Sequence, residues 1–165
     1  MKEWTKQECE DLIHLLCKRY GFDVKVVFRN RATQGTFKVK RDMTPGAVLK
    51  YDRNPRIFLA NMLWTGEYER RDGTVARFEV KPCQRLWTVL HEVAHAMNWA
   101  LNYTAWYNDA HGMAWRQYFR QLCCEHGWNP VFTPNCKIGG HIDGCKDTND
   151  GHFESDAWNV RIDPC

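Results

Sequence analysis

The segment from Leu90 to Met97 contains two histidines one helical turn apart, with a glutamate directly after the first. Side chains four residues apart project from the same side of a helix, so His91 and His95 can reach one metal ion together. Zinc in hydrolytic sites keeps one position for a water and lowers its pKa to about 7. Glu92 is then placed to take the proton of that water. The alternative is a helix with two ordinary histidines; the spacing favours a metal site.

The sequence around these residues predicts a helix. An apolar stripe at helical spacing runs through Leu86, Leu90, Ala94 and Met97, and neither Gly nor Pro occurs in residues 84–102. A helix of this kind would hold both histidines on one face.

A catalytic zinc usually has three protein ligands, so a third must follow. The metzincin continuation is absent, because Asn98 and Leu101 stand where Gly and His would be. A Glu ligand from a later helix would have to be Glu125 or Glu154. The stronger candidate is His111, for which the alternative is a surface histidine near the start of a helix.

The residues around His111 predict a second helix. Asp109 is typical of an N-cap, the helix would run to about Glu125, and Gly127 would end it. On such a helix His111 and Trp115 share one face, so we expect the histidine to point towards the core.

These two segments together resemble the SprT-like zinc metallopeptidases. That family combines a His-Glu-x-x-His helix, a connector of moderate length and a His-Gly-x-x-aromatic sequence, here His111 to Trp115. The match covers residues 86–122 well and residues 1–60 more loosely. The resemblance implies zinc ligands at His91, His95 and His111 and a catalytic base at Glu92.

The resemblance further implies a compact zincin fold and an activity. The protein would be a metalloendopeptidase that cuts protein substrates through a zinc-activated water, with DNA-associated proteins among the candidate substrates and DNA as a candidate partner. The alternative is a non-hydrolytic, zinc-stabilised binding module for a DNA-associated partner. The chain departs from the family in having no Cys-x-x-Cys pair and an additional charged segment before the motif helix. We therefore expect a small, divergent member, such as a phage or plasmid encodes.

The length and composition of the chain are consistent with a small metallopeptidase. The 165 residues suit one domain, and the formal net charge of +3 neither argues for nor excludes nucleic acid binding. The N-terminus lacks the apolar region of a signal peptide, and no stretch is long and apolar enough to span a membrane. We expect a monomer in the cytoplasm, the host cytoplasm for a phage protein, with its cysteines reduced or bound to metal.

The order of predicted elements indicates an α+β fold. Residues 4–20 predict a helix, and alternating patterns predict short strands near 24–28, 36–40, 47–51 and 56–60, in a small mixed or antiparallel sheet. By resemblance, residues 56–60 would be the edge strand on which substrate lies as an added strand, and an ordinary sheet strand is the alternative.

Residues 67–79 predict a charged hairpin around a two-residue Asp-Gly turn, either solvated or lining a substrate cleft.

The composition changes after residue 127. We predict a metallopeptidase domain over residues 1–127 and a loop-rich extension over 128–165 that packs on it. A second, structural zinc could order this extension, and disulfides or aromatic packing are the alternatives. Its candidate ligands are Cys123 or Cys124, His126, Cys136, His141 and Cys145.

The chain contains eight Trp. Four of them cluster around the predicted metal segment: Trp87, Trp99, Trp106 and Trp115. We interpret them as core residues that keep the site dry, and stacking on single-stranded nucleic acid is the alternative.

Overall fold

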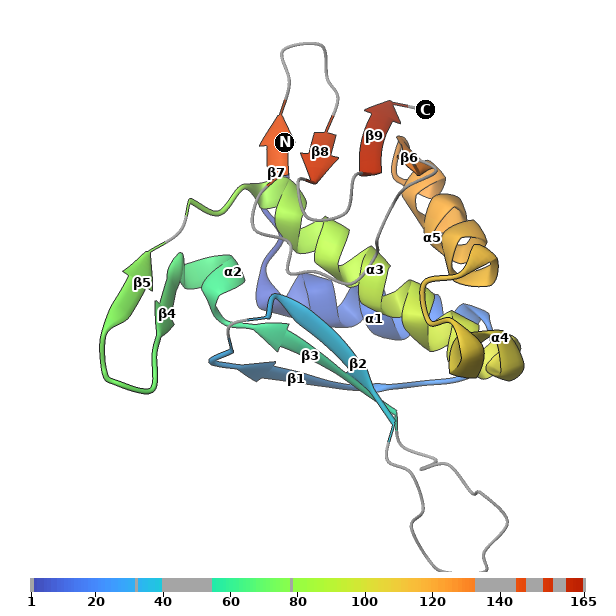
Figure 1. Cartoon of the computed structure of the whole chain (residues 1–165), viewed down its shortest axis with the longest axis horizontal. Coiled ribbons are helices and arrows are strands. Elements are labelled where there is room, and N and C mark those ends of the chain that lie inside the picture. Colours follow the sequence, from blue (N-terminus) through green and yellow to red (C-terminus); the bar gives the residue numbers. More distant parts are fainter. Residues whose placement is uncertain are drawn as a thin grey trace, which may run out of the picture.

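The computed structural model describes residues 2–31, 33–39, 55–77, 79–132, 145–147, 153–155 and 160–164. These residues form a mixed α+β structure with five helices and three small sheets (Figure 1). The long helix α3 lies at the centre, between α1 and the first sheet on one side and α5 on the other.

The first helix, α1 (Lys6–Arg19), begins at a capping box. The Glu8 backbone N–H donates to the Thr5 hydroxyl at 3.2 Å, and the Thr5 backbone N–H donates to the Glu8 carboxylate at 2.9 Å. The helix ends before Gly21, which has a φ of 83°. Its apolar face is buried in the core, so the helix predicted over 4–20 is confirmed.

The first sheet contains β1 (Lys25–Arg29), β2 (Gly35–Lys38) and β3 (Arg56–Ala60) in the order β1-β3-β2. The central strand β3 runs parallel to β1 and antiparallel to β2. The expectation that residues 56–60 form an edge strand is therefore wrong. The run from Ile57 to Ala60 is buried at every position, because Ile57 and Leu59 belong to the core and Arg29 and Arg31 cover Phe58 on the other face.

Among the described residues, β2 is the edge strand of this sheet that contacts α3. The strand predicted at 47–51 lies outside the described residues.

The short helix α2 (Met62–Thr65) leads into a hairpin of β4 (Glu67–Glu69) and β5 (Val75–Arg77). The predicted hairpin is confirmed. Its loop, counted between the hydrogen-bonded residues Arg70 and Thr74, has three residues instead of two. The Arg70 N–H donates to the Thr74 carbonyl at 2.8 Å, and Gly73 has a φ of 82°. Glycine in this left-handed conformation is typical of three-residue hairpin loops.

The three remaining helices are α3 (Pro82–Leu101), α4 (Tyr103–Asn108) and α5 (Met113–Glu125). The proline at the start of α3 has its φ already set for a helix. Most of α3 is buried, because α1, the sheet and α5 cover different sides of it. The helix predicted over 84–102 is confirmed.

The described parts of the C-terminal segment form an antiparallel sheet in the order β6-β9-β8-β7. Its strands are β6 (Trp128–Phe132), β7 (Cys145–Asp147), β8 (Phe153–Ser155) and β9 (Val160–Pro164). Strand β6 contacts α5, the helix that precedes it. The domain division at residue 127 stays a prediction.

Candidate metal centre

Helix α3 brings the first two predicted ligands together. The Nε2 atoms of His91 and His95 lie 3.0 Å apart, and the two residues are only 4% and 8% exposed. This separation follows from their i, i+4 spacing on a regular helix. Two buried imidazole nitrogens at this distance have the geometry of neighbours on one ion.

The third histidine, His111, lies in the turn between α4 and α5 and not on a helix. The prediction that Asp109 caps α5 is wrong, because the N-cap is Gly112. The Asp109 carboxylate accepts from the His111 N–H at 3.2 Å, and the Asp109 carbonyl accepts from the Gly112 N–H at 3.1 Å. An aspartate that hydrogen-bonds the backbone two residues later makes a turn, and this turn aims His111 at α3.

The three histidines form one cluster. Their candidate ligand atoms all lie within 4.8 Å of one another, and the ring centres of His95 and His111 are 4.4 Å apart. Zinc bonds to imidazole nitrogen at about 2.0–2.1 Å, which places two tetrahedral ligands about 3.4 Å apart. These three imidazoles therefore fit a metal ion. Small rotations of the rings would bring their nitrogen atoms to bonding distance from it.

Groups around the cluster orient the imidazoles. The carbonyl of Ala110 accepts a hydrogen bond from His95. The Trp115 indole N–H donates to the His91 carbonyl at 3.4 Å, and the indole ring packs edge-on against the His91 ring at 4.8 Å. Such partners fix ring orientation in metal sites. The segment that supplies His111 therefore also orients His95.

Burial keeps these imidazoles neutral. Desolvation, and then the neighbouring histidines, lower the pKa of His91 well below 6.5, and desolvation does the same for His95. The pKa of His111 is lowered to about 4, again chiefly by burial. Neutral imidazole is the form that binds metal, so little proton release would oppose binding at neutral pH.

Glu92 lies beside the cluster on the side of the edge strand. Its Oε1 is 3.9 Å from the His91 Nε2, and the residue is 4% exposed. Burial raises the pKa of Glu92 to about 8, although the Phe37 backbone N–H and the charge of Arg31 act in the other direction. The carboxylate is therefore a stronger base than an exposed glutamate.

Strand β2 passes so close to this carboxylate that only glycine fits. A Cβ on Gly35 would lie 2.6 Å from the Thr88 methyl carbon and 2.7 Å from the Glu92 Oε1. Sequence reasoning missed this residue. A single glycine within a strand pattern can mark a close approach of backbone, and that was the one available signal.

The four tryptophans divide into two pairs. Trp87 and Trp115 are completely buried, which excludes them from stacking on nucleic acid bases. Trp99 and Trp106 contact the ring of Phe37 on β2, with ring centres 6.0 and 6.3 Å apart. The second pair therefore covers the end of β2 next to Glu92.

The predicted second zinc site is not assembled within the part of the chain that the structure describes. In that part, His91, His95 and His111 form the one cluster of three candidate ligands. Cys123 is buried and Cys124 exposed, with His126 partly buried after them. The remaining candidates lie outside the described side chains: Cys136, His141 and Cys145. The second zinc stays a prediction.

No protein-family model, curated protein or solved structure matches this chain.

Within the described residues, none of the helices has the length and apolarity needed to cross a membrane.

Proposed function

We propose that this protein is a zinc-dependent metallopeptidase of the SprT-like kind, which hydrolyses peptide bonds in protein substrates. One observation carries the proposal: a buried carboxylate, Glu92, lies next to a cluster of three histidines, of which two are buried and one is partly buried. A site that only binds metal for stability has no use for a base at this position.

In this proposal His91, His95 and His111 hold the zinc. When bound there, zinc would polarise the scissile carbonyl and lower the pKa of a water. Glu92 accepts the proton of the attacking water on a carboxylate oxygen and passes it to the departing amine. Burial raises the pKa of Glu92 in the protein alone, which makes its carboxylate a stronger base, and the charge of a bound zinc would lower that pKa again towards the operating pH, where a general base and acid works best.

Strand β2 would bind the substrate. Among the described residues it pairs with β3 on one side only, so its other side can accept an extended peptide. The Phe37 N–H donates a hydrogen bond to the Glu92 carboxylate, so β2 is in direct contact with the proposed base. A peptide added along β2 would therefore pass close to the carboxylate. We also propose a zincin-like fold, supported by the packing of α3 against this edge strand.

The second candidate is a zinc-stabilised binding module without hydrolytic activity, acting on a DNA-associated partner. The burial of His91 and His95 favours it, since both are less than 10% exposed, as in a closed structural site. This alternative predicts bound zinc and no dependence of function on Glu92.

Degradation of fluorescently labelled casein by purified, zinc-loaded protein tests the proposal. The wild-type chain should release peptides, and Glu92→Gln should not, while retaining its zinc. Glu69→Gln removes an exposed carboxylate on β4 and is the matched control, with wild-type activity expected. Equal activity in wild type and Glu92→Gln contradicts the proposed mechanism. Full zinc loading without turnover in the wild type favours the binding module.

A further inference from the structure

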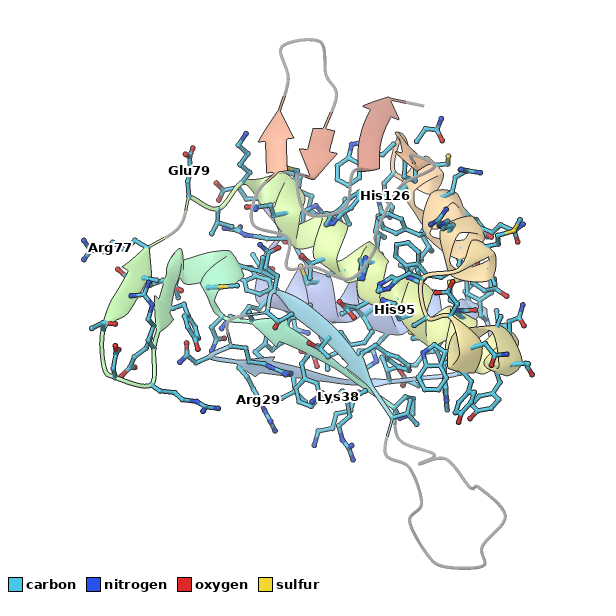
Figure 2. All side chains as sticks on the ribbon, in the orientation of Figure 1. Arg29, Lys38, Arg77, Glu79, His95 and His126 are labelled. Carbon is cyan, nitrogen blue, oxygen red and sulfur yellow. The ribbon has the colours of Figure 1, made fainter. Side chains whose placement is uncertain are left out.

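One face of the β1-β3-β2 sheet points away from α1 and α3 and carries several cations. We call this face the basic sheet face. Its cations are Lys25, Arg29, Arg31, Lys38 and Arg56. Figure 2 shows Arg29 and Lys38 pointing away from the helices on this side of the sheet.

The strand register aligns three of these cations. Lys25 on β1 and Lys38 on β2 both pair with Arg56 on β3, so the three side chains form a row across the sheet. Neighbouring strands are about 4.8 Å apart, so the row is about 10 Å long.

Two arginines extend the face beyond this row. The guanidinium carbons of Arg29 and Arg31 lie 4.7 and 5.2 Å from the centre of the Phe58 ring. Ile57 and Leu59, its neighbours on β3, belong to the core on the other side of the sheet. Arg29 is four residues from Lys25, or about 13 Å along the strand.

Within the described residues of these three strands, no acidic residue interrupts the basic sheet face. Its uncharged members are Val27, Thr36, Phe58 and Ala60. Lys25, Arg29 and Lys38 are exposed and form no ion pair with any described residue.

The concentration of charge is greater than the net charge of +3 suggests. The chain has 23 basic and 20 acidic side chains, so without these five cations the acidic ones would be in excess. Five of the 23 basic side chains gather on this one face, a local concentration of positive charge that the composition does not reveal.

We propose that the basic sheet face binds the phosphate backbone of duplex nucleic acid, without sequence specificity. Phosphate contacts from Lys and Arg supply nearly all of the affinity in such binding. Proteins that prefer single strands add exposed aromatic rings on which bases stack. The one aromatic residue of this face, Phe58, is 7% exposed and covered by arginines, so the face offers cations without a stacking platform.

An anionic membrane fits the basic sheet face less well. Peripheral membrane binding adds buried apolar side chains to charge attraction. The face has Val27 as its one partly exposed aliphatic residue, between charged rows. Binding to nucleic acid stands apart from the proposed peptidase activity, because Lys25, Arg29 and Lys38 lie on the opposite face of the sheet from Gly35, although the charge of Arg31 reaches Glu92.

Fluorescence anisotropy with a labelled random-sequence DNA duplex tests the inference, at salt concentrations from about 50 to about 200 mM. The variant Lys25→Gln/Arg29→Gln/Lys38→Gln should bind at least about tenfold more weakly than wild type. The slope of log affinity against log salt should fall by about 2–3, at about 0.9 for each lost phosphate contact. Thermal unfolding should be unchanged, because the three side chains are exposed.

The matched control removes the same charge from the β4–β5 hairpin, with Arg70→Gln/Arg71→Gln/Arg77→Gln. Its affinity for the duplex should stay within about threefold of wild type if the location of the cations decides binding. Equal loss in both variants would show a net-charge effect and overturn the proposal. Undetectable duplex binding, tighter binding of the single strand, or preferential binding to phosphatidylserine vesicles would overturn it as well. None of these readouts depends on peptidase activity.

Discussion

Replacing Gly35 by alanine should disturb the candidate site through a single added carbon. That carbon would meet the Thr88 methyl at 2.6 Å, the Glu92 Oε1 at 2.7 Å and the Glu92 Cγ at 2.8 Å. Ordinary contacts of this kind begin at 3.4 Å. Either β2 must move outwards by about 0.6–0.8 Å, or the Glu92 carboxylate must turn away, because a well-packed interior has little free space.

The size of the effect follows from two opposing contributions. Overpacking a buried position costs about 1–3 kcal/mol. Alanine also restricts the unfolded chain more than glycine, which returns about 0.4–1 kcal/mol. We therefore expect Gly35→Ala to lower the free energy of unfolding by about 1–2 kcal/mol. Displacement of a catalytic group by about 1 Å can reduce turnover about a hundredfold.

Urea unfolding and casein turnover should be measured on the same preparations. Thr88→Ser removes the methyl group that makes the closest contact and keeps a hydroxyl that can donate to the Gln84 carbonyl. Combined with Gly35→Ala, it should recover part of the lost stability, with a coupling energy of about 0.5–1 kcal/mol. Gly127→Ala is the control: its φ of 80° makes alanine unfavourable, yet an added Cβ there meets nothing within 4 Å.

The control should lose stability without losing zinc or turnover. A close contact between β2 and Glu92 is refuted if Gly35→Ala unfolds at the same urea concentration as wild type and shows no coupling to Thr88. It is also refuted if Gly127→Ala reduces turnover as much as Gly35→Ala does.

Three further outcomes are expected. His111→Asn should weaken zinc binding at least about tenfold in competition with a chelating dye, whereas His14→Asn, outside the cluster, should not. In zinc-free protein, the free energy of unfolding should fall as pH drops from 6.5 to about 4. The reason is that the pKa of His111 is about 4 in the folded state, so the unfolded chain binds more protons in this range. Urea titrations at several pH values should show a smaller fall for His111→Asn. The Cys9 thiol, buried and with its pKa raised to about 12, should react with a thiol reagent only on unfolding, whereas the exposed Cys124 should react in the native protein.

The parts of the site that depend on local spacing could be predicted from sequence. His91, Glu92 and His95 belong to one regular helix, whose periodicity fixes their relative positions. His111 was identified by residue type, but its position in a turn was not. Asp109 explains the difference, because a side chain that bonds nearby backbone N–H groups is common both at helix N-caps and in turns.

The parts that depend on tertiary structure could not be predicted. Gly35 is restricted by side chains more than fifty residues later in the chain, and no local pattern records that contact. The central position of β3 depends on which strands pair on each side, although its continuous apolar run was a signal. The basic sheet face depends on register across three strands, whereas composition gives only a sum of charges.

The zinc content of protein purified without added metal tests the central claim most directly, by elemental analysis alongside native mass spectrometry. We predict that His91→Asn/His95→Asn has one zinc per chain fewer than wild type, and that the control His14→Asn has the wild-type content. A second zinc present in both wild type and His91→Asn/His95→Asn would assign a structural site elsewhere in the chain. Wild-type protein without zinc, or a zinc content unchanged by the loss of His91 and His95, would contradict the account.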